Sequence, residues 1–227
     1  MSRLPHAETR VCLVGATGLI GSLALEGAHG RESLQLTVIA RRQPMGAGPP
    51  SVRVLCGETA HWSDFIASSQ ADVLVCVLGT TRAKAGSPAA FQAVDRDLVL
   101  TCGRAARAAG VERMIVVSSV GANSGSRNLY LRTKGEMEAG LVQLGFGRLD
   151  ILRPAQLIGH RDERRALESI AQAAANLLDI LMRGPLRRYH SIAAQDVASA
   201  ILALAEQSEP GCFIHKYDDI LKAARSL

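Results

Sequence analysis

The chain has few aromatic residues and no long apolar run. Phe, Trp and Tyr make up 4% of its 227 residues, too few to supply stacking platforms for nucleic-acid bases. Nowhere do about 18 apolar residues follow one another, the length that a membrane-spanning helix needs. The first ten residues are polar, and no apolar stretch there resembles a secretion signal. We therefore expect neither a nucleic-acid partner nor a membrane partner.

Cysteine is scarce and scattered through the chain. The five cysteines are Cys12, Cys56, Cys76, Cys102 and Cys212. Their number is odd, and Cys12 and Cys76 lie inside apolar runs that are typical of buried strands. Disulfides and thiolate metal sites are therefore disfavoured, and we expect no bound metal. A reducing, cytoplasmic location fits this cysteine usage.

The positive charge of the chain is not gathered into one long cluster. The formal net charge is +5 at pH 7, which attracts phosphates, but nucleic-acid binding needs clustered bases on one face. Arg161, Arg164 and Arg165 are interrupted by Asp162 and Glu163. This mixture is typical of a solvated helix face, and polyanion binding stays the weakest of the functional hypotheses.

What the chain does contain is an ordinary globular composition with a regular alternation. Hydrophobic residues make up 48% and charged residues 21%, and the length suits one domain spanning residues 1–227. Strands are predicted over Val11–Val14, Leu36–Ala40, Val52–Leu55, Val73–Leu78, Met114–Val117 and Leu149–Leu152. Such short apolar runs, separated by helical segments, predict an α/β fold with a Rossmann-type, doubly wound parallel sheet.

Longer segments of helical period lie between and after these strands. Helices are predicted over Leu19–Ala28, Ala89–Ala109, Leu129–Leu144, Asp162–Met182 and Gln195–Glu206. After Pro154 the alternation stops, and two amphipathic helices precede a late strand over Cys212–Tyr217. We expect residues 155–192 to form a small C-terminal substrate lobe over the strand ends.

A glycine-rich run directly follows the first predicted strand and opens the first predicted helix. Its residues with a predicted role in cofactor binding are Gly15, Thr17, Gly18, Leu19, Ile20 and Gly21. A strand that turns sharply into a helix presents free backbone N–H groups and a positive dipole end to a diphosphate. A tight turn without a ligand is the alternative. The position at the start of a βαβ series favours a dinucleotide site.

Two arginines stand at the end of the second predicted strand. An NAD-specific protein usually has an acidic residue there for the ribose 2′-hydroxyl, whereas an arginine suits a 2′-phosphate. A guanidinium can bind phosphate oxygens through two parallel hydrogen bonds. Arg41 is the first choice for this role and Arg42 its helper, and the alternative is two solvated surface arginines. The predicted cofactor is therefore NADP(H).

Ser, Tyr and Lys side chains are spaced for proton transfer. Ser118 and Ser119 end the fifth predicted strand, and Tyr130 and Lys134 follow on the next helix. A separation of four residues places Tyr130 and Lys134 on one helix face, where the ammonium can stabilise a phenolate. Ser119, or failing that Ser118, would donate a hydrogen bond to a substrate carbonyl. Tyr130 would deliver the proton, and Lys134 would also hold the nicotinamide ribose.

With the glycine turn and this Ser, Tyr and Lys set, the chain resembles the short-chain dehydrogenase/reductase superfamily. The segment from Arg153 and Pro154 to Gly159 is similar to the segment that lines the nicotinamide site in the extended branch. That resemblance implies that Arg153 and Pro154 contact the cofactor. Extended-branch enzymes that act on sugars are much longer, so a nucleotide-sugar substrate is not expected.

Within the superfamily the chain resembles the Tat-interacting-protein-like oxidoreductases, an atypical branch similar to nucleoside-diphosphate-sugar epimerases. The strings that carry this resemblance are Leu78-Gly79-Thr80-Thr81-Arg82, Val94-Asp95-Arg96-Asp97 and Tyr130-Leu131 with Lys134-Gly135-Glu136. The resemblance implies NADPH binding, with Leu78, Gly79 and Thr80 beside the cofactor.

Two functional hypotheses from different classes follow. The first is an NADPH-dependent oxidoreductase that acts on an unidentified small carbonyl or alcohol. The second is an NADPH-binding regulatory protein with little or no turnover, which membership of this branch also permits. The helices that begin at Ala89 and Leu129 are candidates for a homodimer interface.

Overall fold

The computed structural model describes residues 8–44, 52–158 and 184–226, and one parallel sheet organises them. Its strands are β1 (Thr9–Val14), β2 (Leu34–Ala40), β3 (Arg53–Cys56), β4 (Val73–Cys76), β5 (Arg113–Val117), β6 (Arg148–Leu152) and β9 (Gly211–His215). Their spatial order is β3-β2-β1-β4-β5-β6-β9. The order reverses between β1 and β4, and this switch point is the usual ligand position of a doubly wound sheet. The predicted Rossmann-type α/β fold is confirmed.

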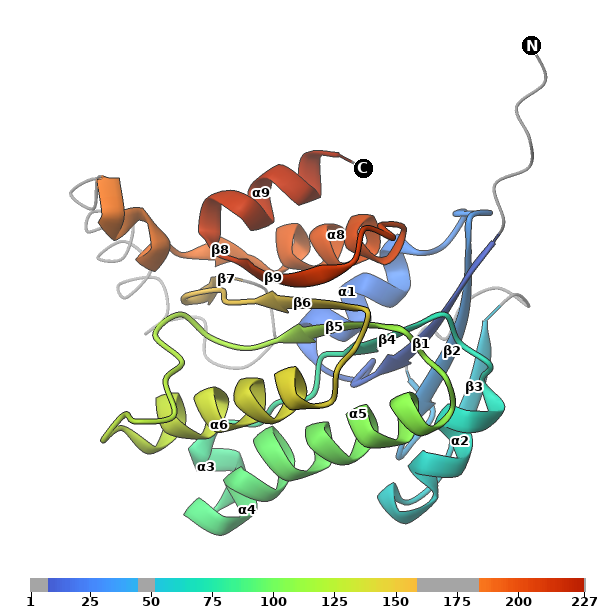
Figure 1. The fold of residues 1–227 in the computed structure, drawn as a ribbon, viewed down its shortest axis with the longest axis horizontal. Helices are drawn as coiled ribbons and strands as arrows, with labels where there is room; N and C mark the ends of the chain where they lie inside the picture. The colour runs from blue at the N-terminus through green and yellow to red at the C-terminus, as the bar shows by residue number, and fades with distance from the viewer. Residues whose placement is uncertain (1–7, 45–51, 159–183, 227) are drawn as a thin grey trace.

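Helices cover both faces of this sheet, giving three layers (Figure 1). One face carries α1 (Leu19–Gly27), α8 (Ala194–Ala205) and α9 (Tyr217–Arg225). The other carries α2 (Trp62–Ser68), α4 (Pro88–Gln92), α5 (Val99–Ala108) and α6 (Leu129–Gln143), with the short α3 (Arg82–Ala85) at one end. Because both faces are covered, β4 is apolar along its whole length and its neighbours β1 and β5 are apolar over most of theirs, as is typical of parallel sheets.

The sheet divides the apolar core into two parts. Leu13, Val75 and Ile115 point to the side of α1 and α8. Their chain neighbours on the strands point the other way, where Val116 packs with Leu141 of α6. This alternation along each strand fixes which polar residues reach each face where the strands end.

The predicted helix over Ala89–Ala109 is in fact three consecutive pieces. α4 leads into a π-helical turn, Ala93–Leu98, before α5 continues. The wider turn accommodates an extra residue, and such turns occur frequently at functional sites. The late strand also ends earlier than predicted, at His215. There the Asp219 carboxylate accepts the backbone N–H of Lys216 and starts α9, a helix that the sequence analysis did not predict.

The predicted substrate lobe lies mostly outside the described residues. The predicted helix over Asp162–Met182 falls there entirely, together with Arg161, Arg164 and Arg165. At the two ends of that segment, β7 (Leu157–Ile158) and β8 (Ile192–Ala193) pair as a two-stranded parallel sheet. Among the helices that the structure describes, none is long and apolar enough to cross a membrane.

Candidate functional site

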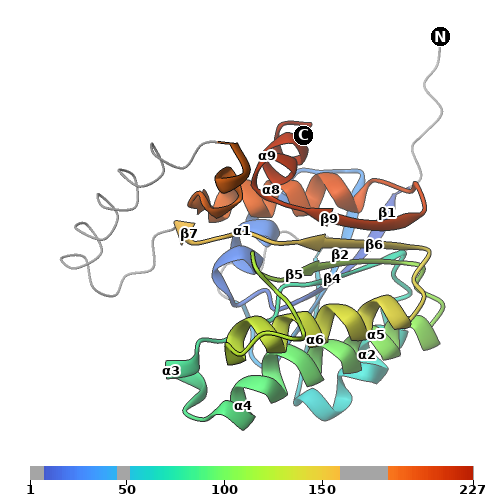
Figure 2. The same cartoon turned by 60° about the vertical axis from the view of Figure 1, so that its left-hand side comes forward.

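The predicted site residues lie at one edge of the sheet. They follow β1, β2, β4, β5 and β6, and parallel strands bring their carboxyl ends to the same edge. Figure 2 shows α3, which follows β4, and β7, which follows β6, at this same end of the molecule. The topology therefore brings segments that are far apart in the sequence to one edge.

The glycine-rich turn between β1 and α1 is held in a tight conformation. Gly15 has φ +99°, and a Cβ there would stand 2.8 Å from the backbone carbon of Val77. A Cβ on Gly21 would stand 2.2 Å from the carbonyl oxygen of Gly15. No side chain caps the first turn of α1 at Gly18. An uncapped helix start beneath a close glycine turn is suited to binding a diphosphate.

Arg41 and Arg42 are exposed directly after β2. Neither guanidinium has a hydrogen-bond or ion-pair partner among the described residues. Exposed guanidinium groups after β2 are compatible with the predicted 2′-phosphate contact, which stays a prediction.

The turn after β4 is tied to a buried carboxylate. The backbone N–H of Thr80 donates to Oδ2 of Asp95 over 2.8 Å. Asp95 comes from the π-helical turn and is 1% exposed. A Cβ on Gly79 would lie 3.5 Å from Oδ1 of Asp95. Asp95 therefore lies directly beside the Gly79–Thr80 turn.

The same carboxylate binds the lysine of the predicted catalytic set. The Nζ atom of Lys134 lies 2.9 Å from Oδ1 of Asp95, and the two side chains are 4% and 1% exposed. Cys76 is buried beside this pair, and burial raises the pKa of its thiol to about 11. The thiol is therefore protonated near neutral pH, and Asp95 and Lys134 are the charged members of this group.

Tyr130 stands one helical turn before Lys134 on α6. Its ring is half-buried and packs against Phe91 of α4, with ring centroids 5.8 Å apart. The helix begins at Asn128, whose side chain accepts hydrogen bonds from the backbone N–H groups of Tyr130 and Leu131. The helix start is thus fixed immediately before the tyrosine.

Gly135, which follows Lys134 on α6, allows the loop after β5 to approach this helix closely. A Cβ on Gly135 would stand 2.2 Å from the backbone nitrogen of Ser124. The N–H of Asn123 also donates to the carbonyl oxygen of Leu131 over 3.0 Å. The loop that follows β5 therefore packs directly on the helix that carries Tyr130 and Lys134.

The two predicted serines occupy different environments at the end of β5. Ser118 is 4% exposed, and its Oγ atom has no hydrogen-bond partner within the described part of the chain. The Oγ atom of Ser119 donates to the carbonyl oxygen of Val120 over 3.3 Å, a long contact. Neither hydroxyl is hydrogen-bonded to Tyr130 within the described ranges, so the structure brings these groups to one edge without joining them directly.

Arg153 and Pro154 are both positioned by protein contacts. The guanidinium of Arg153 forms an ion pair with Glu138 of α6. The carbonyl oxygen of Pro154 accepts the N–H of Val120 over 2.9 Å. Arg153 therefore contacts α6 in this structure, and its predicted contact with the cofactor stays a prediction.

Sequence reasoning missed two residues of this site, Asp95 and Gly135. Both stand in strings that carried the family resemblance, but neither was given a role there. A signal for Asp95 was present, since an acidic residue on the buried side of a helix needs a partner. Its partner, Lys134, is far away in the sequence and is identified only by the fold.

Two observations test whether a dinucleotide fits this edge. The glycine turn lies so close to its own backbone that a Cβ at Gly15 or Gly21 would collide with it, and this tight turn leads into a helix start without a side-chain cap. The buried Oγ of Ser118 lacks a partner within the described residues, as expected for a polar group beside a ligand. Both observations fit an NAD(P)-type cofactor.

A family model described as NAD(P)H-binding matches residues 15–208, and the chain belongs to this family of NAD(P)-binding proteins. The fold agrees with that of the Bordetella bronchiseptica enzyme WbmH in complex with NAD+, with a TM-score of 0.68 and 15% identity, over 92% of this chain and 75% of that one. UDP-glucose 4-epimerase from Thermus thermophilus in complex with NAD is similar at a TM-score of 0.66 and 20% identity, over 96% and 83%. The predicted membership of an NAD(P)-binding family is confirmed, and the fold is the one that NAD-binding epimerases share.

Fungal proteins are similar along nearly the whole chain. Protein FMP52, mitochondrial, of Candida albicans is 36% identical, over 95% of this chain and 98% of its own length. The corresponding protein of Emericella nidulans is 35% identical, over 74% of this chain and 75% of its own length. These relatives are named as mitochondrial proteins, so the cytoplasmic location expected from cysteine usage was wrong. Scattered buried thiols indicate a reducing environment, and more than one compartment provides it.

Proposed function

We propose that the protein is an NADPH-dependent oxidoreductase acting on a small carbonyl or alcohol. The observation that carries this proposal is the buried Lys134, held one helical turn from Tyr130 and next to the Gly79–Thr80 turn. A lysine is rarely buried without a specific purpose, because burial removes its ammonium from water. Here its position supports a role in both cofactor binding and proton transfer.

In the proposed reaction each side chain has a separate task. NADPH, when bound, would supply the hydride. Ser119 would donate a hydrogen bond to the carbonyl oxygen of the substrate, and Tyr130 would transfer its phenolic proton to that oxygen. Lys134 would stabilise the phenolate that remains and would hold the nicotinamide ribose. Leu78, Ser118 and Pro154 would line the nicotinamide end of the site.

The preference for NADPH over NADH is proposed from Arg41 and Arg42. Both are exposed after β2, and neither guanidinium has a partner among the residues described. A free guanidinium fork suits the 2′-phosphate of NADPH. The finer placement in the Tat-interacting-protein-like branch is part of the same proposal.

A second function is an NADPH-binding regulatory protein with little or no turnover. One observation favours it: the ammonium of Lys134 is paired with Asp95, which partly cancels the charge that would stabilise a Tyr130 phenolate. In that case the protein would bind the cofactor, and Ser119, Tyr130 and Lys134 would transfer protons only very slowly.

The rate of NADPH oxidation with a panel of carbonyl compounds separates the two functions. The native protein and Tyr130→Phe are compared, because the variant keeps the ring that packs on Phe91 and loses only the hydroxyl. We expect the variant to lose at least about 100-fold in rate, the usual scale of general acid catalysis. NADPH binding without turnover of any compound would support the regulator. A native protein that binds neither NADPH nor NADH would refute both.

Location and assembly are further proposals. The names of the relatives favour a mitochondrial protein, which cell fractionation would test. We also propose a homodimer through α4–α5 and α6, without nucleic-acid or membrane partners. Val142 near the end of α6 is 53% exposed, and sedimentation of a Val142→Glu variant would reveal whether it lies in the interface.

A further inference from the structure

We propose that Asp95 is a positioning residue that holds Lys134 in place for the cofactor and couples it to the Gly79–Thr80 turn. The inference rests on the proposed function, and it adds a residue to which the sequence analysis gave no role. Asp95 is at the centre of two contacts, one to the Lys134 ammonium at 2.9 Å and one to the Thr80 N–H at 2.8 Å.

The burial of this pair is the first step of the argument. Lys134 and Asp95 are 4% and 1% exposed at their side chains. Water therefore does not solvate either charge, and each depends on the other. A lysine side chain has four rotatable bonds, so a single fixed counter-ion largely determines where its ammonium lies.

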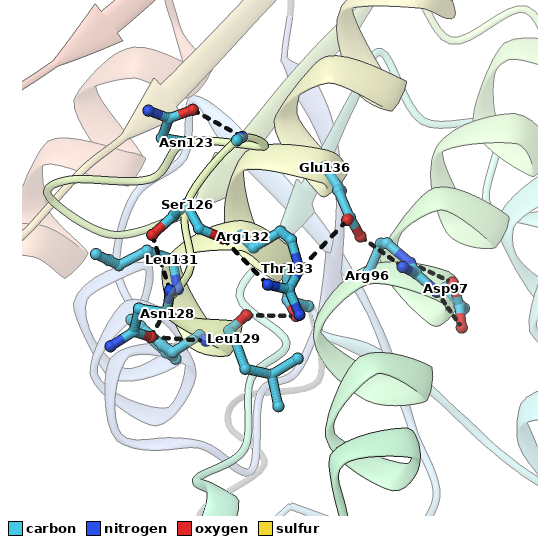
Figure 3. A network of polar contacts seen from close by, with 12 residues as sticks. Arg96, Asp97, Asn123, Ser126, Asn128, Leu129, Leu131, Arg132, Thr133 and Glu136 are labelled. Carbon is cyan, nitrogen blue, oxygen red and sulfur yellow. Dashed lines mark hydrogen bonds and ion pairs between the residues drawn. The ribbon is translucent and has the colours of Figure 1, made fainter.

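The geometry of the π-helical turn is the second step. Asp95 lies within Ala93–Leu98, between α4 and α5, and this wider turn presents its carboxylate to the end of β4. The turn is also tied to α6 on its outer side. There Arg96 contacts Glu136 at 2.5 Å, and Arg132 approaches the same carboxylate at 3.9 Å (Figure 3). Two separate ion pairs thus join these helices, one buried at the site and one half-exposed.

These two ion pairs provide a matched comparison. If the Asp95 pair only fastened the helices together, breaking the outer pair with Glu136→Gln would have a similar kind of effect. If Asp95 positions Lys134 for the cofactor, only Asp95→Asn changes cofactor binding. The asparagine keeps an oxygen that can accept the Thr80 N–H, so this variant isolates the ion pair with Lys134.

The experiment is calorimetric titration of the full chain with two ligands, NADPH and adenosine 2′,5′-bisphosphate. The second ligand lacks the nicotinamide ribose and does not extend to Lys134. We expect Asp95→Asn to weaken NADPH binding about tenfold, the scale of a lost positioning interaction, and to change bisphosphate binding less than about twofold. Glu136→Gln should leave both affinities within about twofold of the native protein.

A double variant shows whether Asp95 acts through Lys134. Lys134→Met should weaken NADPH binding as Asp95→Asn does, and Asp95→Asn/Lys134→Met should equal Lys134→Met alone. Losses that multiply in the double variant would overturn the proposal, because Asp95 would then act independently. Equal changes for both ligands would overturn it as well, since they would indicate a general charge effect.

Loss of folding must be distinguished from loss of NADPH binding. Melting curves establish that each variant is folded. If Asp95→Asn alone does not fold, the double variant, which removes both buried charges, is compared with Lys134→Met instead. A native chain that binds no NADPH refutes the proposed function. A native chain that binds NADPH, with Asp95→Asn matching Glu136→Gln, refutes only the role of Asp95.

Discussion

The two edges of the parallel sheet differ in whether all of their polar groups have partners inside the described protein. At the amino edge there is an open cleft of about 760 Å³, lined in part by Arg10, Asp72, Arg113 and Arg148. Its arginines are already bound by the protein itself. Arg10 pairs with Asp72 at 2.7 Å, and Arg113 donates to the carbonyl oxygens of Ala205 and Gln207 over 3.0 Å.

At the carboxyl edge Lys134 and Arg153 are paired with acidic residues, but other polar groups have no partner among the described residues. The guanidinium groups of Arg41 and Arg42 have no partner in the parts of the chain that are described. The Oγ atom of Ser118 is buried there without a hydrogen bond to any described residue. The start of α1 has no side-chain cap. Buried polar groups are normally paired, so the unpaired Oγ atom of Ser118 indicates that a ligand binds at this edge.

The comparison shows that the presence of a cleft does not by itself identify a ligand-binding site. The polar groups of the amino-edge cleft bind one another, whereas at the carboxyl edge the guanidinium groups of Arg41 and Arg42 and the Oγ atom of Ser118 have no partner among the described residues. Variants at the two edges should therefore separate stability from binding. Amino-edge variants should lower stability and leave cofactor affinity intact, whereas carboxyl-edge variants should lower cofactor affinity.

The largest effect is expected from Asp150→Asn, within the network of the amino half. Asp150 accepts two hydrogen bonds from Arg148, of 2.7 and 2.9 Å, and lies 2.8 Å from Nε2 of His215. The variant leaves a buried guanidinium without its counter-ion, which should lower the free energy of unfolding by about 3 kcal/mol. Urea denaturation measures this loss.

Two controls sharpen this prediction. Glu112→Gln breaks an exposed ion pair with Arg107 and should leave the unfolding midpoint unchanged. The folded Asp150→Asn protein should keep its NADPH affinity within about twofold, because distant sites act independently. A large loss of affinity without loss of stability would contradict the division between the two edges.

The next largest effect is expected from Gly21→Ala at the carboxyl edge. The new methyl group would stand 2.2 Å from the carbonyl oxygen of Gly15, so the glycine turn must shift. We expect NADPH affinity to fall at least about 100-fold, or about 2.7 kcal/mol. Gly27→Ala in the same helix is the control, since its methyl group meets only the flexible end of Leu202 at 3.1 Å. Unchanged binding by Gly21→Ala would mean that no diphosphate lies on this turn.

The fold was predictable because its central strands are buried on both faces. Runs such as Val73–Cys76 are apolar at every position, a pattern typical of a parallel sheet. The glycine turn was predictable for a related reason: all of its residues are consecutive, so their spacing is visible in the sequence. Tyr130 and Lys134 lie on one helix, and a four-residue separation places them on one face.

Contacts between distant segments were not predictable in this way. The carboxylate of Asp95 reaches Lys134 only because a π-helical turn lies beside α6, and helical periodicity predicted one uninterrupted helix there. Arg153 is a similar case. The family resemblance predicted a cofactor contact, which stays a prediction, and the ion pair of its guanidinium with Glu138 of α6 was not visible in the sequence.

A moderate effect is expected from Arg41→Ala. Loss of a guanidinium that binds the 2′-phosphate should weaken NADPH binding about tenfold, or about 1.4 kcal/mol. NADH has no 2′-phosphate, so its affinity should stay within about twofold. Titration of Arg41→Ala and Arg42→Ala with both cofactors measures the ratio. An equal loss for the two cofactors would show that Arg41 contributes only general positive charge.

The smallest effect is expected from Asp72→Asn at the amino edge, and it should depend on pH. The guanidinium of Arg10 hydrogen-bonds to the Asp72 carboxylate and lowers the pKa of that carboxyl in the folded protein. The stabilisation is therefore fully present above the ordinary aspartate pKa of about 3.9 and disappears as the pH falls through the lower folded-state value. Because the pair is largely exposed, we expect the melting temperature to fall by less than about 2 °C at pH 7. Melting curves of the two proteins should converge as the pH falls through the lowered folded-state pKa of Asp72, and a difference that grows in acid would show that Asp72 is stabilising in its protonated form.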